Sequence, residues 1–200
     1  MKKKLGMMFV CGLLVLTSSW CFADTVLFTD LTGAPASPAY IINPTDTVGF
    51  EFASSATATL DSIEIALSEF ASDPATVTLY QDSSGSLGTK LESWTVANLP
   101  TFFGGTDIAP VTLSSNGSVQ LTQGDSYWLV VSNPDNPVNW DYGSASGIED
   151  NNGTVSATTH NMGAFEVTGS GPASVPEPMA ALFLGPTLFG LVAVGRRFKK

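Results

Sequence analysis

Hydrophobic and polar residues alternate with a period of two through most of the middle of the chain. The clearest runs are Thr47–Phe52, Ser62–Leu67, Thr76–Tyr80, Ser93–Val96 and Ala164–Val167. This period predicts β-strands with one face toward a core and the other toward water. The run Tyr127–Val131 is apolar on both faces, which favours a central strand covered on both sides.

Turn residues separate these runs at short intervals. Asn116-Gly117 predicts a tight hairpin between Val111–Leu113 and Val119–Leu121. Regularly spaced short strands without an amphipathic helix predict an all-β fold, an antiparallel two-sheet sandwich or jelly roll. We place this domain at residues 24–168 and a Gly/Ser/Pro linker at 169–174.

The alternation also predicts which side chains form the core. The expected buried residues are Phe50, Phe52, Ile63, Ile65, Val77, Leu79, Trp128 and Val130. Glu51, Glu64 and Thr78 are one step out of phase and are expected to face water.

The chain begins with a targeting segment. Lys2–Lys4 precede an apolar stretch, Leu5–Leu16, and small residues end the region at Ala23, as in a secretory signal peptide that occupies residues 1–23. Both cysteines, Cys11 and Cys21, lie inside this segment. The mature domain is therefore expected to have neither a disulfide nor a cysteine metal site.

The domain is strongly acidic once its ends are set aside. Residues 24–175 contain seventeen Asp and Glu against a single basic residue, Lys90, which gives a net charge of −16. Such a surface repels nucleic acid, so nucleic-acid binding is not expected.

The last twenty-six residues, 175–200, have three parts. Val175-Pro176-Glu177-Pro178 comes first, then an uncharged apolar run at 179–195, and then a basic end formed by Arg196, Arg197, Lys199 and Lys200. The run is at the short end of what can cross a bilayer as a helix, and the basic end favours a cytoplasmic C-terminus. The alternative is a buried core helix, but core helices seldom end in four free cations.

These three parts resemble the PEP-CTERM sorting signal of Gram-negative bacteria that make exopolysaccharide. The resemblance implies that Pro176, Glu177 and Pro178 are recognised by exosortase, a membrane transpeptidase-like enzyme that removes the tail. It also implies export across the inner membrane, a membrane-anchored precursor, and a final location at the cell surface or outside the cell.

A second resemblance concerns the domain itself. Leu60–Leu67, Val77–Asp82, Gly85–Gly88, Leu121–Val130 and Trp140 follow in an order similar to that of the choice-of-anchor extracellular domains of type R. That family supplies no catalytic residues to transfer, and no catalytic residue is predicted here.

The search for chemistry yields a few candidates. His160, the only histidine, lies in a polar stretch typical of a surface, and no G-x-S-x-G sequence accompanies it. Trp140 and Tyr142 follow a proline-rich loop and are candidate carbohydrate contacts. Glu149 and Asp150, and more weakly the loop Asp82–Gly85, are candidate calcium ligands, although such side chains more often cap turns. No other cofactor is expected.

Two functions from different classes remain open. The first is an exported surface or matrix protein, associated with exopolysaccharide or biofilm, whose β-sandwich is structural or binds a ligand without catalysis. The alternative is a secreted carbohydrate-active enzyme or a carbohydrate-binding module. The absence of a recognisable catalytic motif favours the first.

Overall fold

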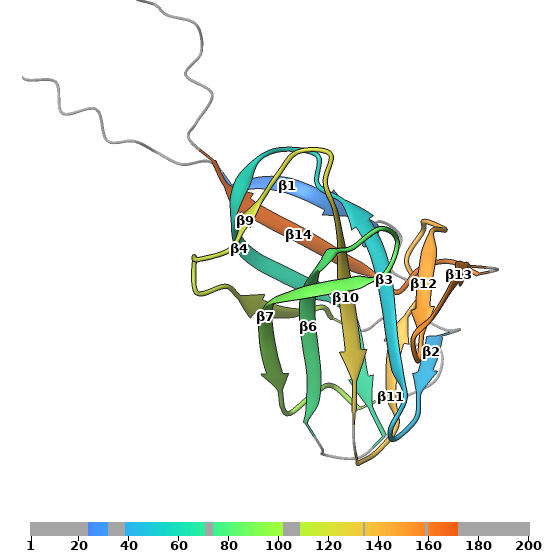
Figure 1. Cartoon of the computed structure of the whole chain (residues 1–200). Helices are drawn as coiled ribbons and strands as arrows, with labels where there is room; N and C mark the ends of the chain where they lie inside the picture. Colours follow the sequence, from blue (N-terminus) through green and yellow to red (C-terminus); the bar gives the residue numbers. More distant parts are fainter. Residues whose placement is uncertain are drawn as a thin grey trace, which may run out of the picture.

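The computed structural model describes residues 24–31, 39–70, 74–101, 109–133, 135–158 and 160–171 (Figure 1). These residues form fourteen strands, and none of them belongs to a helix that could span a membrane. The strands are β1 (Asp24–Thr29), β2 (Ala39–Ile42), β3 (Thr47–Ala53), β4 (Ala58–Ile65), β5 (Leu67–Glu69), β6 (Ala75–Asp82), β7 (Leu87–Val96), β8 (Val111–Ser114), β9 (Gln120–Leu121), β10 (Ser126–Ser132), β11 (Val138–Asp141), β12 (Ile148–Asn151), β13 (Thr154–Ala157) and β14 (Phe165–Ser170).

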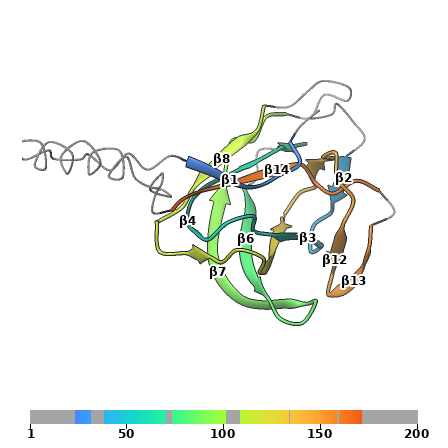
Figure 2. The same ribbon diagram turned by 90° about the horizontal axis from the view of Figure 1, so that it is seen from above.

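The strands form two layers, which are seen edge-on in Figure 2. One layer is a six-stranded sheet in the order β13-β12-β3-β10-β6-β7. The other combines a five-stranded sheet, β1-β14-β4-β8 with β9 also on β4, and a three-stranded sheet, β2-β11-β5. Ala66 links these two sheets, because its N–H donates to Ala164 and its carbonyl accepts the N–H of Asp141. The predicted all-β class, with antiparallel sheets in a sandwich-like arrangement, is confirmed, although the described strands form three sheets and not the predicted two.

Aromatic side chains fill the space between the layers. Phe50 packs on Trp140 with ring centroids 4.9 Å apart, and Phe52 packs on Phe165 at 5.5 Å. Phe28 contacts both Phe52 and Phe165. Edge-to-face and tilted contacts of this kind add to the free energy gained by burying the rings.

Every residue predicted for the core is buried, but two of them are buried elsewhere. In the six-stranded sheet, Leu129 lies opposite Phe50 and Leu79 and faces the second layer. Trp128 and Val130 are out of phase with Leu129, so they lie on the outer face of the sheet instead. Their predicted burial is correct, and β10 is covered on both faces, as the apolar run Tyr127–Val131 predicts.

The hairpin between β6 and β7 covers Trp128 on that outer face. The β6–β7 ladder shifts register on both sides of Tyr80, and bulges of this kind bend a strand. In Figure 1 the first part of β7 crosses in front of β6 and β10, and Figure 2 shows the hairpin curving out of the plane of the sheet. The indole N–H of Trp128 donates to Asp82 Oδ1 at 2.8 Å, so the hairpin is bonded to the ring that it covers.

The residues predicted to face water divide into two groups. Glu51 and Glu64 are half-buried on outer faces. Thr78 also points outward, but it is buried and only 7% exposed, so its predicted exposure is wrong. Its hydroxyl is hydrogen-bonded to the Ser93 hydroxyl at 3.0 Å, and Val130 lies directly beside it on β10.

Two further predictions, a hairpin and a domain boundary, differ from the structure. Asn116-Gly117 does not form a tight hairpin, because β8 and β9 do not pair with each other and instead follow one another along β4. The turn residues form a loop in that edge strand, where Asn116 Oδ1 accepts the N–H of Ser118. At the other end, β14 continues through Gly169 and Ser170, the first two residues of the expected linker.

Candidate functional site

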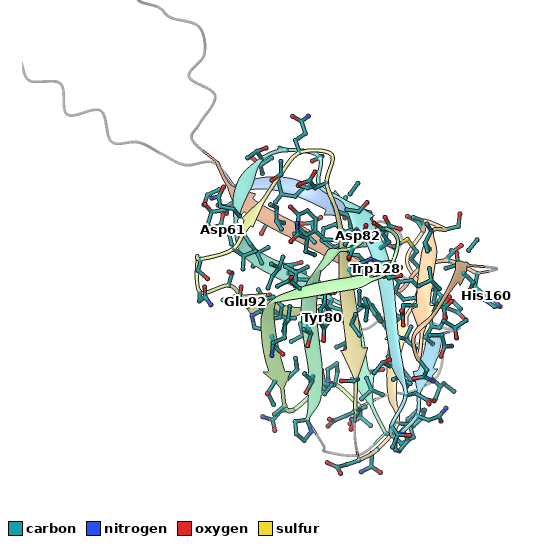
Figure 3. The ribbon with its side chains drawn as sticks, in the orientation of Figure 1. Asp61, Tyr80, Asp82, Glu92, Trp128 and His160 are labelled. Carbon is teal, nitrogen blue, oxygen red and sulfur yellow. The ribbon has the colours of Figure 1, made fainter. Side chains whose placement is uncertain are left out.

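Three aromatic rings and one carboxylate gather where β2, β12 and the segment after β11 meet. We call Tyr40, Tyr142 and His160 the aromatic cluster. The rings of Tyr40 and Tyr142 are perpendicular, with centroids 4.7 Å apart, and those of Tyr142 and His160 are nearly parallel at 6.1 Å. Tyr40 and Tyr142 are half-buried and His160 is exposed, so the cluster reaches the surface. Figure 3 shows His160 at the edge of the molecule, apart from the labelled residues of the β6–β7 hairpin.

The strand registers position the two tyrosines. Tyr40 lies opposite Trp140 in the β2–β11 pair, and its ring contacts the core residue Phe50 at 5.0 Å. Tyr142 lies two residues after Trp140, and an isolated bridge to Gly163 holds it. The core therefore fixes the inner edge of the cluster and leaves its outer edge accessible.

Glu149 accepts a hydrogen bond from the cluster. The hydroxyl of Tyr40 donates to Glu149 Oε2 at 3.2 Å, and the amide of Asn151 donates to Glu149 Oε1 at 3.4 Å. Burial, and then the negative charge of Glu149, raises the pKa of Tyr40. The same two causes raise the pKa of Tyr142. Both phenols are therefore neutral hydrogen-bond donors at neutral pH.

This arrangement can bind a ligand that has both apolar and polar surfaces. Aromatic faces with nearby hydrogen-bonding groups suit ligands that have an apolar face and a polar rim, such as sugar rings. Glu149 is a carboxylate whose negative charge acts on both tyrosines of the cluster.

Trp140 is not the exposed platform expected from the sequence. It is 0% exposed, its indole N–H donates to the carbonyl of Ala164 at 3.1 Å, and Gly163 packs directly against its ring. The proline-rich loop places Trp140 on β11, which lies against the core residue Phe50. Tyr142, the other predicted carbohydrate contact, remains accessible within the aromatic cluster.

The candidate calcium ligands have other partners. Glu149 and Asp150 are adjacent on β12, so their side chains point to opposite faces. Asp150 is buried and caps a turn by accepting the N–H of Gly153 at 2.9 Å. Asp82 likewise accepts the N–H of Gly85 on both oxygens at 3.1 Å. In the part of the chain that the structure describes, no three His, Cys, Asp or Glu side chains are grouped as metal ligands would be.

The predicted sorting residues lie outside the described residues. They are Pro176, Glu177 and Pro178 of the motif, and Arg196, Arg197, Lys199 and Lys200 of the basic end. The signal peptide at 1–23 and the expected membrane segment at 179–195 lie outside them as well.

Sequence reasoning missed Tyr40, which lies between Glu149 and the core. The contact between these residues spans 109 positions, so no local pattern reports it. The only local signal is the short apolar run Ala39–Ile42, which is too short to show an alternation.

A comparison with protein-family models finds no matching family for this chain. A comparison with curated protein sequences finds no matching relative.

Proposed function

We propose that the chain is an exported, exosortase-sorted protein of the cell surface or extracellular matrix that binds glycan without cleaving it. The observation that carries the binding function is the surface-reaching aromatic cluster beside the Glu149 carboxylate. Export and sorting rest on the two terminal signals, with a Gram-negative inner membrane as the barrier crossed and exopolysaccharide as the expected surrounding polymer.

The positions of the two ends of the domain support this proposal. β1 begins at Asp24, the residue that follows the expected cleavage site, and Asp24 pairs with Ser170 near the end of β14. Figure 1 shows that β1 begins and β14 ends at the same end of the sandwich. A leader and a membrane tail can therefore both be attached there without crossing the aromatic cluster.

Export is tested by mass spectrometry of the cell-surface fraction. We expect a major species that lacks residues 1–23 and that has lost the tail beyond the Pro-Glu-Pro motif. Glu177→Ala should leave the tail attached while the leader is still removed. A major surface species that retains both Met1 and Lys200 would contradict the export model.

Binding is tested by incubating the full-length chain with exopolysaccharide and measuring both retention and new reducing ends. Tyr142→Ala removes an accessible ring and should reduce retention. Tyr80→Ala removes a half-buried tyrosine on a different face and should not (Figure 3). The appearance of new reducing ends would favour the alternative, a secreted carbohydrate-active enzyme. Equal retention of the two variants would exclude the aromatic cluster as the binding site.

A further inference from the structure

A second site lies at one end of the six-stranded sheet. A cavity of about 240 Å³ opens where β3 and β6 begin and β10 ends. Its lining consists of Thr45, Asp46, Thr47, Thr76, Ser132 and Asn133. We call it the hydroxyl pocket, because four of these six side chains are hydroxyls.

The strand register builds the floor of this pocket. Ser132 lies directly opposite Thr47 on one side and Thr76 on the other. The neighbours Val48, Val77 and Val131 are buried in the core, so the three hydroxyl residues share the outer face. Adjacent strands lie about 4.7–4.9 Å apart, so the floor is a short row of evenly spaced hydroxyls.

Asn133 supplies a buried donor without a partner. Its Oδ1 accepts the N–H groups of Asp135 and Asn136 at 3.0 and 3.2 Å, which fixes the side chain. Its Nδ2 is buried and has no hydrogen-bond partner, and the whole residue is 1% exposed. Asn133 is therefore a rigidly held residue in the wall of the pocket.

Asp46 supplies a fixed acceptor at the rim. Its two oxygens accept the side-chain amides of Asn43 and Asn152, each at 3.1 Å. Asn152 is held in turn, because its Oδ1 accepts the N–H of Thr47 at 2.7 Å. A carboxylate can accept about four hydrogen bonds, so Asp46 can still accept a donor from a ligand.

We propose that the hydroxyl pocket binds one neutral monosaccharide unit of a glycan. Sugar hydroxyls both donate and accept, which matches a row of hydroxyls beside a carboxylate acceptor. An anionic sugar is disfavoured, since Asp46 is the only charged residue among the described residues of the lining and the domain carries a net charge of −16. The pocket is smaller than the usual cavity for a drug-sized ligand, which suits a single ring.

The pocket is separate from the aromatic cluster, and its position favours access to a polymer. The strand ends that form it lie at the bottom of Figure 1, and the end of the sandwich where β1 begins and β14 ends lies at the top. If the chain is tethered through its ends, this pocket faces away from the tether. That orientation rests on the proposed sorting, whereas the binding chemistry does not.

The test uses the full-length chain in a detergent without a sugar head group. The probes are methyl glycosides of glucose, galactose and mannose, with glucuronate and glucosamine as charged comparisons, and binding is followed by NMR titration. We expect at least one neutral glycoside to bind in the millimolar range, to shift the signals of Ser132 and Asn133, and to bind more tightly than glucuronate.

Three variants locate the binding. Thr76→Val keeps the shape of the side chain and removes a lining hydroxyl, so affinity should fall about tenfold, the value of one hydrogen bond. Asn133→Asp keeps the turn-capping oxygen and adds a second negative charge to the lining, which should weaken the binding of glucuronate further. Thr78→Val, one step along the same face of β6 and outside the pocket, is the matched control and should bind as the parent does.

The results separate this site from the aromatic cluster. Tyr142→Ala should leave glycoside binding to the pocket unchanged even if it weakens retention on polysaccharide. The proposal is overturned if no neutral glycoside binds saturably, if only glucosamine binds, or if Thr76→Val and Thr78→Val behave alike.

Discussion

Trp140 and Trp128 are both completely inaccessible, yet different parts of the molecule bury them. Trp140 lies between the two layers, against Phe50 and Phe165, and its N–H donates to a backbone carbonyl. Trp128 lies on the outer face of the six-stranded sheet under the β6–β7 hairpin, and its N–H donates to the side chain of Asp82. Exposure alone therefore does not define the core. One ring depends on the whole sandwich, and the other depends on a single hairpin, which we expect to open locally before the sandwich unfolds.

The largest effect should follow truncation of the ring between the layers. Trp140→Ala removes contacts with both layers and leaves a cavity, so the free energy of unfolding should fall by about 3–5 kcal/mol. Domains of this kind are typically stable by ~5–15 kcal/mol, so the loss is a large share of the total. Urea denaturation measures it. A loss below ~1 kcal/mol would mean that Trp140 is not part of the structural core.

The second prediction concerns a carboxyl group at the edge of the same core. Asp30 Oδ1 accepts the N–H of Phe165 at 2.8 Å, and its side chain rests on the backbone of Gly143. Burial raises the pKa of Asp30 from 3.8 to about 7. The folded state therefore holds this proton more tightly than the unfolded state does. Its stabilising contribution is complete below pH 4 and is lost as the pH rises to 7, at up to about 1.4 kcal/mol per pH unit.

Asp30→Asn should remove that pH dependence, because the amide keeps an oxygen for the N–H of Phe165 and carries no charge. We expect the variant to be more stable than the parent at pH 8, with the difference shrinking toward pH 4. Urea denaturation at four pH values measures it. Asp125→Asn, at an exposed position, controls for the change in net charge. Parallel pH profiles for the parent and Asp30→Asn would contradict the assignment.

A smaller and more local effect is expected at Trp128. Asp82→Ala removes the acceptor of the indole N–H and the cap of the hairpin turn, which should cost about 1–2 kcal/mol. Hydrogen exchange of the indole N–H, followed by NMR, should accelerate for Trp128 and stay slow for Trp140. Asp82→Asn keeps an acceptor oxygen and should retain most of the protection. Equal acceleration at both indoles would mean that the hairpin does not open independently.

The sequence predicted the β-sandwich because strand alternation is a local property. Ile63 and Ile65 alternate with Glu64, and the structure places them as that pattern requires. The run Tyr127–Val131 is apolar throughout, so the alternation does not reveal that Trp128 lies on the outer face and Leu129 on the inner face. The bend of the β6–β7 hairpin buries Trp128 on the outer face as completely as the core buries Trp140.

The candidate site was harder to predict from the sequence than the fold. Tyr142 and Glu149 were selected for separate roles, as a sugar contact and a calcium ligand, and the structure brings both beside Tyr40. That meeting depends on how the β2–β11 pair lies against β12, which no local pattern encodes. Asn133 is a second example. The turn that it caps is a local feature, but its place in the lining of a cavity depends on the fold.

The smallest predicted effect is a gain in stability on removing a surface charge, which alternation alone would not reveal. Glu64 faces outward on β4, and the register places it directly opposite Glu166 on β14. Like charges in directly opposed cross-strand positions are destabilising, typically by roughly 0.2–1 kcal/mol. Glu64→Gln should therefore raise the free energy of unfolding by a few tenths of a kcal/mol, and the gain should shrink in 1 M salt because the charges are screened.

The neighbour of Glu64, Ile65, faces the core, and Ile65→Ala should lower the free energy of unfolding by about 2–5 kcal/mol. Denaturation midpoints of the two variants, measured at low and high salt, test both predictions. If Glu64→Gln destabilises as much as Ile65→Ala, the β4–β14 register is wrong, and so is the face assigned to every side chain on β4.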